Sequence, residues 1–357
     1  MNKFRGNRVH PIALGAIGTP MRPLSFIIPA YNCQATVEAS VASILDGNLG
    51  EGDEVVLVND GSTDGTAEVL AGIAARCPQV RVVTHPGNRG GAAARNTAVR
   101  EARHDLLFCL DSDNLLVPGS VAGLRIFLEA EGADAAAFRE IRYFYDRPES
   151  CTHLWRFSEG RFTLADYLSG GVVPGASGNY LFTRASWQKA EGYPEFAGAL
   201  DTWGFGLRQV ATGQRMMVMA EGYYHHRYGH ESYWVRDARQ GRISSTAAEI
   251  LRPFFDQLDG GDVTRITGTR HASKWFGDLH RHPIHLASGV GGQAGVVLDT
   301  AGRVIPPGRL RLGRKLLVLL VNGIRWLLLR FLTPRQTKAL RLWVQARLPG
   351  KRSASDG

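Results

Sequence analysis

Two acidic residues, Asp111 and Asp113, directly follow a short apolar run in this 357-residue chain. The run, residues 106–110, is long enough for a strand buried on both faces and too short for a helix. Burying carboxylates at a strand end is costly unless a positive charge meets them. Two carboxylates one residue apart can share a hard divalent cation, which readily bridges to phosphates. The same spacing also occurs by chance in helix caps and solvated turns, so the neighbouring sequence must decide.

Strands and helices alternate ahead of this pair. Three further apolar runs predict buried strands, at residues 24–28, 55–58 and 80–83. Helical spacing of apolar residues follows the first two runs, and an Ala-rich helix through about residue 102 follows the third. This alternation predicts a parallel sheet with right-handed crossovers, a nucleotide-binding architecture. No Gly-x-Gly-x-x-Gly or Walker-type loop follows these strands, which argues against a dinucleotide or P-loop enzyme.

Charge and cysteine content narrow the class of protein. The formal net charge is +9, but thirteen Lys or Arg and no Asp or Glu lie within residues 303–352. The rest of the chain therefore has a net charge of −4, so its body lacks the basic character of a nucleic-acid-binding domain. The four cysteines are widely spaced without a Cys-x-x-Cys pair, which favours reduced thiols in a cytoplasmic protein.

Four ordered motifs link the strand ends to a known family. They are FIIPAYN at residues 26–32, VNDGSTD at 58–64, NRGGAAARN at 88–96 and LDSDN at 110–114. Together they resemble the successive signatures of the family 2 glycosyltransferases, over roughly residues 24–233. The resemblance implies an α/β protein of the GT-A fold, with a Rossmann-like, mostly parallel sheet flanked by helices. Apolar spacing at residues 244–258 adds a C-terminal helical extension.

The resemblance assigns the base of the donor to the first two motifs. Pro29, Ala30 and Tyr31 would flank the base, and Asp60 would accept a hydrogen bond from its imide N–H, as the matching aspartate does for uracil. The residue types also allow simpler interpretations. Tyr31 could pack at the entry to a helix. Asp60 could serve the Asp-Gly turn alone.

The third and fourth motifs would hold the phosphates and the metal. Asn88 and Arg95 resemble the motif whose basic side chain lies near the nucleotide and diphosphate. Arg95 could instead support the site by pairing with Asp60 or Asp111. The resemblance places Asp111 at the ribose and the metal region, and it makes Asp113 a direct ligand of Mn²⁺ or Mg²⁺.

The second half of the domain would supply the acceptor side. The segment GASGNYLF at residues 175–182 resembles the part of the family ahead of the catalytic acid. Asp201 takes the place of the catalytic base. Family members usually carry an acidic pair here, whereas this chain has Leu200 in the first position. Asp201 could also cap the helix expected to run to Val210.

A cluster of histidines and tyrosines, YYHHRYGH, follows at residues 223–230. The resemblance implies that His226, or its neighbour His225, completes the metal shell and that Arg227 neutralises the leaving group. A histidine that is satisfied within the core or at the surface is the alternative.

The chain divides into a leader (1–22), a catalytic domain (23–235), a helical and loop extension (236–305) and a basic tail (306–357). Within the tail, the apolar stretch 316–332 has only seventeen residues and is interrupted by Asn322, Arg325 and Arg330, whereas a spanning helix needs about 20 apolar residues. Basic and apolar residues separate on a helical wheel, which predicts an amphipathic helix on an anionic membrane surface. A helix packed on the body or on a dimer partner is the alternative.

The resemblance therefore implies a metal-dependent, inverting glycosyltransferase that uses a UDP-sugar and a saccharide, lipid-linked or other hydroxyl acceptor. We expect a role in surface polysaccharide or glycolipid synthesis, in the cytoplasm and peripherally on the inner face of the cell membrane. Asp201 would deprotonate the acceptor, and the cation at Asp113 would stabilise the diphosphate. Two alternatives remain. One is a non-catalytic nucleotide-sugar or membrane-surface binding module. The other is a sugar nucleotidyltransferase, which would need a Gly-rich loop after the first strand.

Overall fold

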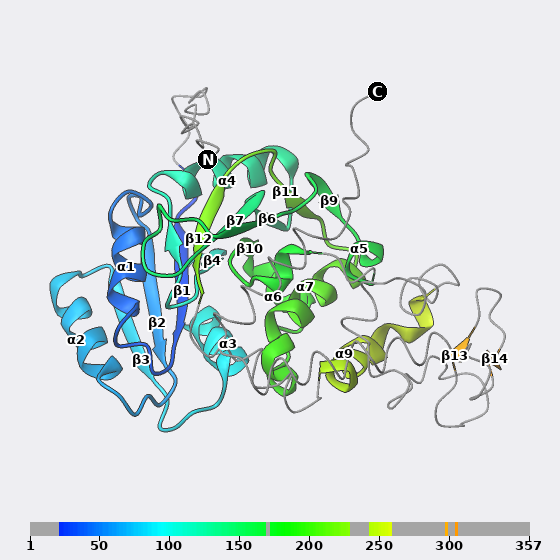
Figure 1. The fold of residues 1–357 in the computed structure, drawn as a ribbon, viewed down its shortest axis with the longest axis horizontal. Coiled ribbons are helices and arrows are strands. Elements are labelled where there is room, and N and C mark those ends of the chain that lie inside the picture. The colour runs from blue at the N-terminus through cyan, green and yellow to red at the C-terminus, as the bar shows by residue number, and fades with distance from the viewer. Residues whose placement is uncertain (1–20, 169–171, 229–242, 259–296, 299–303, 306–357) are drawn as a thin grey trace.

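An eight-stranded sheet lies at the centre of the molecule (Figure 1), within the residues that the computed structural model describes: 21–168, 172–228, 243–258, 297–298 and 304–305. Its first half consists of β3 (Val80–Thr84), β2 (Glu54–Asn59), β1 (Leu24–Ala30) and β4 (Leu106–Cys109), paired in parallel in that order. These are the four apolar runs predicted as strands. Their order brings the carboxyl ends of β1, β2 and β4 side by side, which is where α/β sheets bind ligands.

Helices on both faces explain why these strands are apolar throughout. α1 (Val37–Leu45) and α2 (Thr66–Arg76) follow β1 and β2 and contact each other, and α3 (Gly91–Glu101) packs on β1 and β2. Right-handed crossovers place α1 and α2 on one face of the sheet and α3 on the other. With both faces covered, β2 is buried at all of its positions.

Strand β1 is longer than its sequence predicts, because it continues through Pro29 to Ala30. β1 pairs with β4 only as far as Ile27, so the ladder on that side has ended before Pro29. The Ala30 carbonyl still accepts a hydrogen bond from the Asp60 N–H on the β2 side. A proline lacks the N–H that a ladder needs, and its place beyond the end of β4 removes that need.

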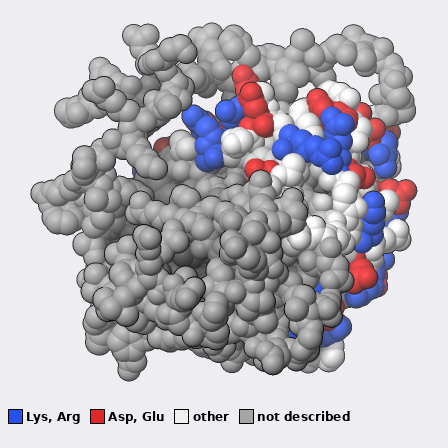
Figure 2. All heavy atoms as spheres, turned by 90° about the vertical axis from the view of Figure 1, so that its right-hand side faces the viewer, with Lys and Arg blue, Asp and Glu red and all other residues white. Residues whose placement is uncertain are grey.

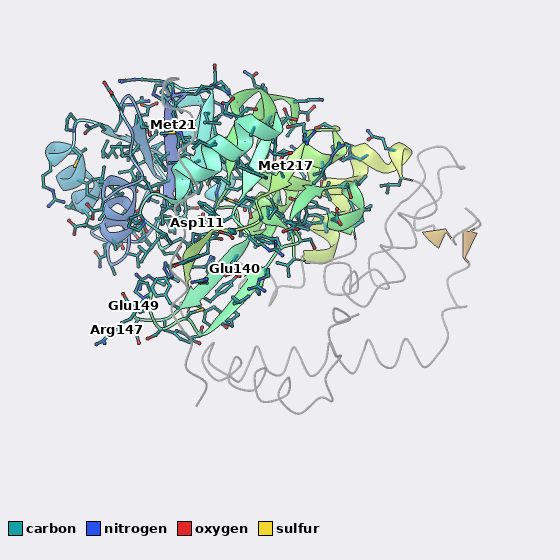
Figure 3. All side chains as sticks on the ribbon, turned by 90° about the horizontal axis from the view of Figure 1, so that it is seen from above. Met21, Asp111, Glu140, Arg147, Glu149 and Met217 are labelled. Atoms are coloured by element: carbon teal, nitrogen blue, oxygen red, sulfur yellow. The ribbon has the colours of Figure 1, made fainter. Side chains whose placement is uncertain are left out.

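The second half of the large sheet is mixed. It consists of β10 (Leu181–Thr183), antiparallel to β4 and to β6 (Ala135–Ala137), followed by β11 (Met216–Val218), parallel to β6, and β9 (Gly160–Phe162). A smaller sheet consists of β5 (Leu115–Leu116), β12 (Tyr223–Arg227), β7 (Glu140–Phe144) and β8 (His153–Arg156). Figure 3 shows Asp111 inside the fold, with the small sheet of Glu140 extending away from it towards Arg147 and Glu149.

The remaining helices are α4 (Ser120–Glu131), α5 (Leu164–Leu168), α6 (Arg184–Lys189), α7 (Asp201–Ala211) and α9 (Ile243–Leu251), with 3-10 turns η1 (Pro174–Ala176), η2 (Glu195–Leu200) and η3 (Arg252–Gln257). β13 (Val297–Leu298) and β14 (Val304–Ile305) form a separate pair. α9 packs on η2 and α7, with Ala247, Ile250 and Leu251 buried in the main core. The helix expected at residues 244–258 thus divides into α9 and η3, because Pro253 interrupts it.

Helix α7 lies almost backbone to backbone on η1. A Cβ added at Gly206 would overlap the Tyr167 hydroxyl and lie 3.0 Å from the Gly175 Cα. The Tyr167 hydroxyl also accepts a hydrogen bond from the Gly175 N–H at 3.1 Å. Glycine at both positions therefore sets the approach of the helix whose first residue is Asp201.

The structure describes only part of the chain on which the predicted membrane attachment can be tested. The predicted tail, residues 306–357, lies outside the described residues, as do most of the leader and most of the extension. In the described part of the chain, no helix combines the length and the apolarity needed to cross a bilayer. On the face drawn in Figure 2, the described Lys, Arg, Asp and Glu side chains are intermixed, as on an ordinary solvated surface.

Gly206→Ala should destabilise the protein, because the new methyl group enters the contact between α7, η1 and Tyr167. Overpacking of this kind lowers the free energy of unfolding by about 1–3 kcal/mol. Gly72→Ala is the matched control, since Gly72 lies in exposed helix α2 with nothing within 4 Å of an added Cβ. That control should gain about 0.5–1 kcal/mol from helix propensity. Urea unfolding of both variants makes the comparison, and equal stabilities would contradict the close packing.

Candidate active site

The predicted site residues fall into three groups at the carboxyl edge of the sheet. The buried Arg95 and Asp201 form one cluster with the partly exposed Asp111. Asp60 belongs to a separate buried network. A third group around Asp113 includes Arg227.

Arg95 joins the other two members of the first group. Its Nη1 donates to Asp201 Oδ2 at 2.6 Å, and its Nη2 donates to Asp111 Oδ1 at 2.6 Å. The Arg95 and Asp201 side chains are only 11% and 6% exposed. The structure thus pairs Arg95 with Asp111, one of the two partners considered from the sequence. It adds Asp201, which the sequence did not suggest.

The charges of this cluster act on each other in low-dielectric surroundings. Burial raises the pKa of the Asp201 carboxyl above its ordinary value, and the charge of Arg95 lowers it part of the way back. Burial acts to lower the pKa of Arg95, but the charges of Asp201 and Asp111 raise it well above its ordinary value. The cluster contains one cationic group and two carboxylates, so it can still attract a proton or a metal ion.

Asn179 fixes the orientation of Asp111. The Asp111 N–H donates to Asn179 Oδ1 at 2.7 Å, and Asn179 Nδ2 donates to Asp111 Oδ2 at 2.9 Å. Asn179 is buried in the turn before β10, the strand that pairs with β4. Its role was missed from the sequence, although it lies inside the GASGNYLF segment that was singled out.

Asp201 is the first residue of α7, which ends one residue beyond the predicted Val210. Its Oδ1 accepts a hydrogen bond from the N–H of the next residue, Thr202, at 2.7 Å. Asp201 therefore satisfies an N–H of the first turn from inside the helix, and Leu200 takes the N-cap position without a side-chain bond. Asp201 is therefore the first helical residue and not the cap considered from the sequence. Its bond to Thr202 is compatible with a role in chemistry, since a carboxylate has about four lone-pair sites.

Asp60 has a structural task in the second group. Its Oδ1 lies 2.6 Å from His85 Nδ1 and accepts from the Arg89 N–H at 3.0 Å, and its Oδ2 accepts from the Gly90 N–H at 2.8 Å. The carboxylate thus holds the backbone just ahead of α3, and it is 2% exposed. His85 was missed because no motif marks it. The contact of Asp60 with the donor base stays a prediction.

The residues expected around the base lie at the end of β1 and after β3. Pro29 and Ala30 complete β1. Tyr31 is 41% exposed, which argues against its use as a packed helix-entry residue. Asn88 is also exposed. The backbone of Asn88 closes on Gly61, where φ is +67° and an added Cβ would lie 2.7 Å from the Asn88 nitrogen.

Arg227 contacts the third group through its backbone and side chain. Its N–H donates to Asn114 Oδ1 at 3.1 Å, and its Nε donates to the Asp113 carbonyl at 3.3 Å. A third bond, from Nη1 to the Tyr145 carbonyl, measures 3.4 Å. Among the ion pairs of the described residues, none joins Arg227 to a carboxylate. Its guanidinium is therefore held beside the Asp113 backbone by carbonyl oxygens.

The two histidines of β12 point to opposite faces of the small sheet. His226 packs against Tyr143, with ring centroids 4.7 Å apart, and His225 packs edge-on against Phe144 at 6.1 Å. Burial, helped by the charge of Arg142, lowers the pKa of His225.

Metal binding stays a prediction, and its main predicted ligands are Asp111 and Asp113. Over the described residues, no three His, Cys, Asp or Glu side chains are already grouped as a metal-ligand set. The carboxylates of Asp111 and Asp113 are ligand types that suit Mn²⁺ or Mg²⁺. The third ligand, predicted as His226, stays a prediction.

These features define an α/β protein with an acidic site at the carboxyl edge of a Rossmann-like sheet. Residues 25–189 match the sequence model described as "Glycosyl transferase family 2". This stretch therefore is a glycosyl transferase family 2 domain, and the family predicted from the four motifs is confirmed.

Characterised relatives share part of this domain. The chain is 41% identical over 98 residues to a chondroitin synthase of Pasteurella multocida (strain Pm70), covering 28% of this chain and 10% of that protein. It is 32% identical over 93 residues to a poly-β-1,6-N-acetyl-D-glucosamine synthase of Staphylococcus epidermidis, covering 26% of this chain and 22% of that protein. The chain thus spans about a tenth of the length of the first relative and about a fifth of the second.

Solved structures show the same fold at low sequence identity. The S. aureus TarS 1–349 structure in complex with UDP-GlcNAc has a TM-score of 0.53 and 18% identity, covering 70% of this chain and 74% of that chain. TarS 1–349 without that ligand has a TM-score of 0.51 and 17% identity, covering 73% and 71%. The predicted GT-A fold is confirmed.

Asp60→Ala should destabilise the fold, because it leaves the Arg89 and Gly90 N–H groups and the His85 ring without their acceptor. Each unsatisfied buried donor costs about 1–3 kcal/mol. Urea unfolding should show this loss, while Asp46→Ala, an exposed aspartate at the end of α1, should unfold like the wild type. Calorimetric titration with UDP then tests the base contact. An unchanged UDP dissociation constant in a folded Asp60→Ala protein would leave Asp60 a structural residue only.

Proposed function

We propose that this protein is an inverting glycosyltransferase, which moves a sugar from a UDP-sugar donor to a hydroxyl group of its acceptor. The observation that carries the proposal is the cluster in which Arg95, a residue of the stretch that matches family 2, joins Asp111 and Asp201. It places the carboxylate assigned to the donor and the carboxylate assigned to the acceptor on one guanidinium.

Asp201 is the general base of this proposal. It would take the proton of the acceptor hydroxyl as the oxygen attacks the anomeric carbon in line. Burial raises the pKa of Asp201, and a base is most efficient when its pKa lies near the working pH. A single displacement needs one base and one stabiliser of the leaving group, held in the right geometry.

The leaving diphosphate would be stabilised on the opposite side. The positive charge of Arg227 is held beside Asp113 by carbonyl groups and suits a departing phosphate. Asp113 and Asp111, with His226, would hold Mn²⁺ or Mg²⁺, which supplies further positive charge for the diphosphate when it is bound.

The comparisons support the donor and the type of product. The TarS structure is a complex with UDP-GlcNAc, and several relatives are synthases of chondroitin, hyaluronan or poly-β-1,6-N-acetyl-D-glucosamine. A saccharide or lipid-linked acceptor in surface polysaccharide or glycolipid synthesis agrees with these names. The chain spans only part of those proteins, so their names support the class of donor and of product in this proposal and nothing finer.

Peripheral attachment to the inner face of the cell membrane completes the proposal. It rests on the charge and apolar pattern of residues 306–357, which lie outside the described residues. A basic amphipathic helix gains about 1 kcal/mol per Lys or Arg near an anionic surface. Such attachment would bring the active site to a lipid-linked acceptor.

A screen of nucleotide sugars with Mn²⁺ or Mg²⁺ tests the proposed function. A glycosyltransferase releases nucleoside diphosphate, faster when an acceptor is present. A sugar nucleotidyltransferase would instead exchange pyrophosphate. A binding module would bind the donor without release of either product. Failure to release nucleoside diphosphate from any UDP-sugar would overturn the proposal.

Asp201→Asn should keep donor binding and lose transfer by roughly 10² to 10⁴, the usual worth of a general base. In the wild type, transfer should fall as the pH drops through the raised pKa of Asp201, because only the carboxylate can accept the proton. Assays of sugar transfer at pH values from about 4 to about 8 measure both effects. Near wild-type transfer by Asp201→Asn would place the base elsewhere.

Asp113→Ala should abolish metal-dependent binding of UDP while leaving the fold intact, since Asp113 lies in a turn outside the strands. Isothermal titration of UDP with and without Mn²⁺ measures the change. Asp46→Ala serves as the exposed control and should bind like the wild type. If chelator leaves wild-type turnover unchanged, the metal role is wrong.

A further inference from the structure

We infer that Arg95 is a positioning residue for the acceptor base, which fixes Asp201 relative to Asp111 across the two halves of the domain. The inference rests on the proposed function and deepens it. The family resemblance assigns Arg95 to the nucleotide and diphosphate. The contacts of its guanidinium instead point to the two carboxylates.

The guanidinium is already committed within the protein. Nη1 and Nη2 each donate to a different carboxylate at 2.6 Å, and Nε is buried without a hydrogen-bond partner. The ring of Tyr193 lies 5.8 Å from the Arg95 Cζ. Both nitrogens belong to a side chain that is only 11% exposed and already pairs with two carboxylates, which argues against Arg95 as a direct ligand of the donor.

The bridge leaves Asp201 able to act. Asp201 Oδ2 accepts from Arg95, and Oδ1 accepts from the Thr202 N–H. A carboxylate has about four lone-pair sites, so two remain for an acceptor hydroxyl. Arg95 therefore holds the base in place without using up its capacity to accept a proton.

A lysine could not replace this geometry. The planar guanidinium presents separate nitrogens in a fixed fork, whereas an ammonium is a single point charge on a flexible stem. The two carboxylates come from distant parts of the chain, Asp111 after β4 and Asp201 at the start of α7. Only a rigid donor between them sets the distance from the donor side to the acceptor side.

The start of α3 is built around the bridge. A Cβ added at Gly91 would lie 2.8 Å from Arg95 Nη1 and 3.2 Å from Asp201 Oδ2. One turn later, Asn96 binds the Tyr193 carbonyl and N–H at 2.9 Å each, so α3 is fastened to the acceptor half independently of Arg95. A methyl group at position 91 would therefore disturb the Arg95–Asp201 contact while that second connection holds.

Gly91→Ala and Arg95→Lys test this role against Gly72→Ala, a helix glycine with open space around it. We expect both test variants to lose transfer by about 10²-fold, the cost of a misplacement near 1 Å. Their UDP dissociation constants with Mn²⁺ should stay within about threefold of the wild type, because Asn179 still holds Asp111 on the donor side. Gly72→Ala should match the wild type in both measurements. Thermal unfolding confirms that each variant is folded.

Three results would overturn the inference. Wild-type transfer by both variants would show that Asp201 needs no positioning by Arg95. Equal losses in UDP affinity and in transfer would show that Arg95 acts at the donor site. Additive effects of Arg95→Met and Asp201→Asn on urea unfolding would show that the two side chains are not coupled.

The unfolding cycle separates failure of this inference from failure of the proposed function. It requires no turnover, so it reports on the bridge even if no UDP-sugar is used. If the cycle shows coupling but no donor gives nucleotide release, the bridge formed by Arg95 stands and the proposed transferase activity is wrong. If a donor gives nucleotide release but the cycle is additive, the transferase activity stands and the positioning role of Arg95 is wrong.

Discussion

A buried guanidinium between two carboxylates is the interaction on which the site depends. Removing Arg95, Asp111 and Asp201 from water is costly, and close pairing is what offsets the cost. Each partner comes from a different element: α3, the turn after β4, and α7. The site therefore forms only when both halves of the domain are packed together, and the loss of one partner would leave a buried charge unpaired.

Polar and glycine residues around the cluster serve this packing. The Asn179 amide fixes Asp111 from the second half of the sheet, and the Asn96 amide joins α3 to the segment before α7. Gly175 and Gly206 allow α7 to approach η1 closely, which positions the first residue of that helix. Much of the precision of the site is thus supplied by side chains, or by missing side chains, that take no part in chemistry.

Charge is distributed unequally along the carboxyl edge of the sheet. The Asp60 carboxylate accepts hydrogen bonds from backbone N–H groups ahead of α3 and contacts the His85 ring. The Arg227 side chain donates its hydrogen bonds to backbone carbonyl oxygens, which carry no formal charge. Asn114 links the segment of Asp111 to that of Arg227, because its amide donates to Asp111 Oδ2 and accepts from the Arg227 N–H.

Sequence patterns alone predict the first four strands with the helices between them, the family, and Asp60, Asp111 and Asp201 as site residues. Apolar runs, helical spacing and motifs are local patterns, so they can be read without knowing what packs against what. The partners of Arg95 became known only from the folded structure. Asp201 lies 106 residues from Arg95 along the chain, and Asn179 lies 68 residues from Asp111. Such partners depend on how helices and strands pack against each other, and no local pattern encodes those distances.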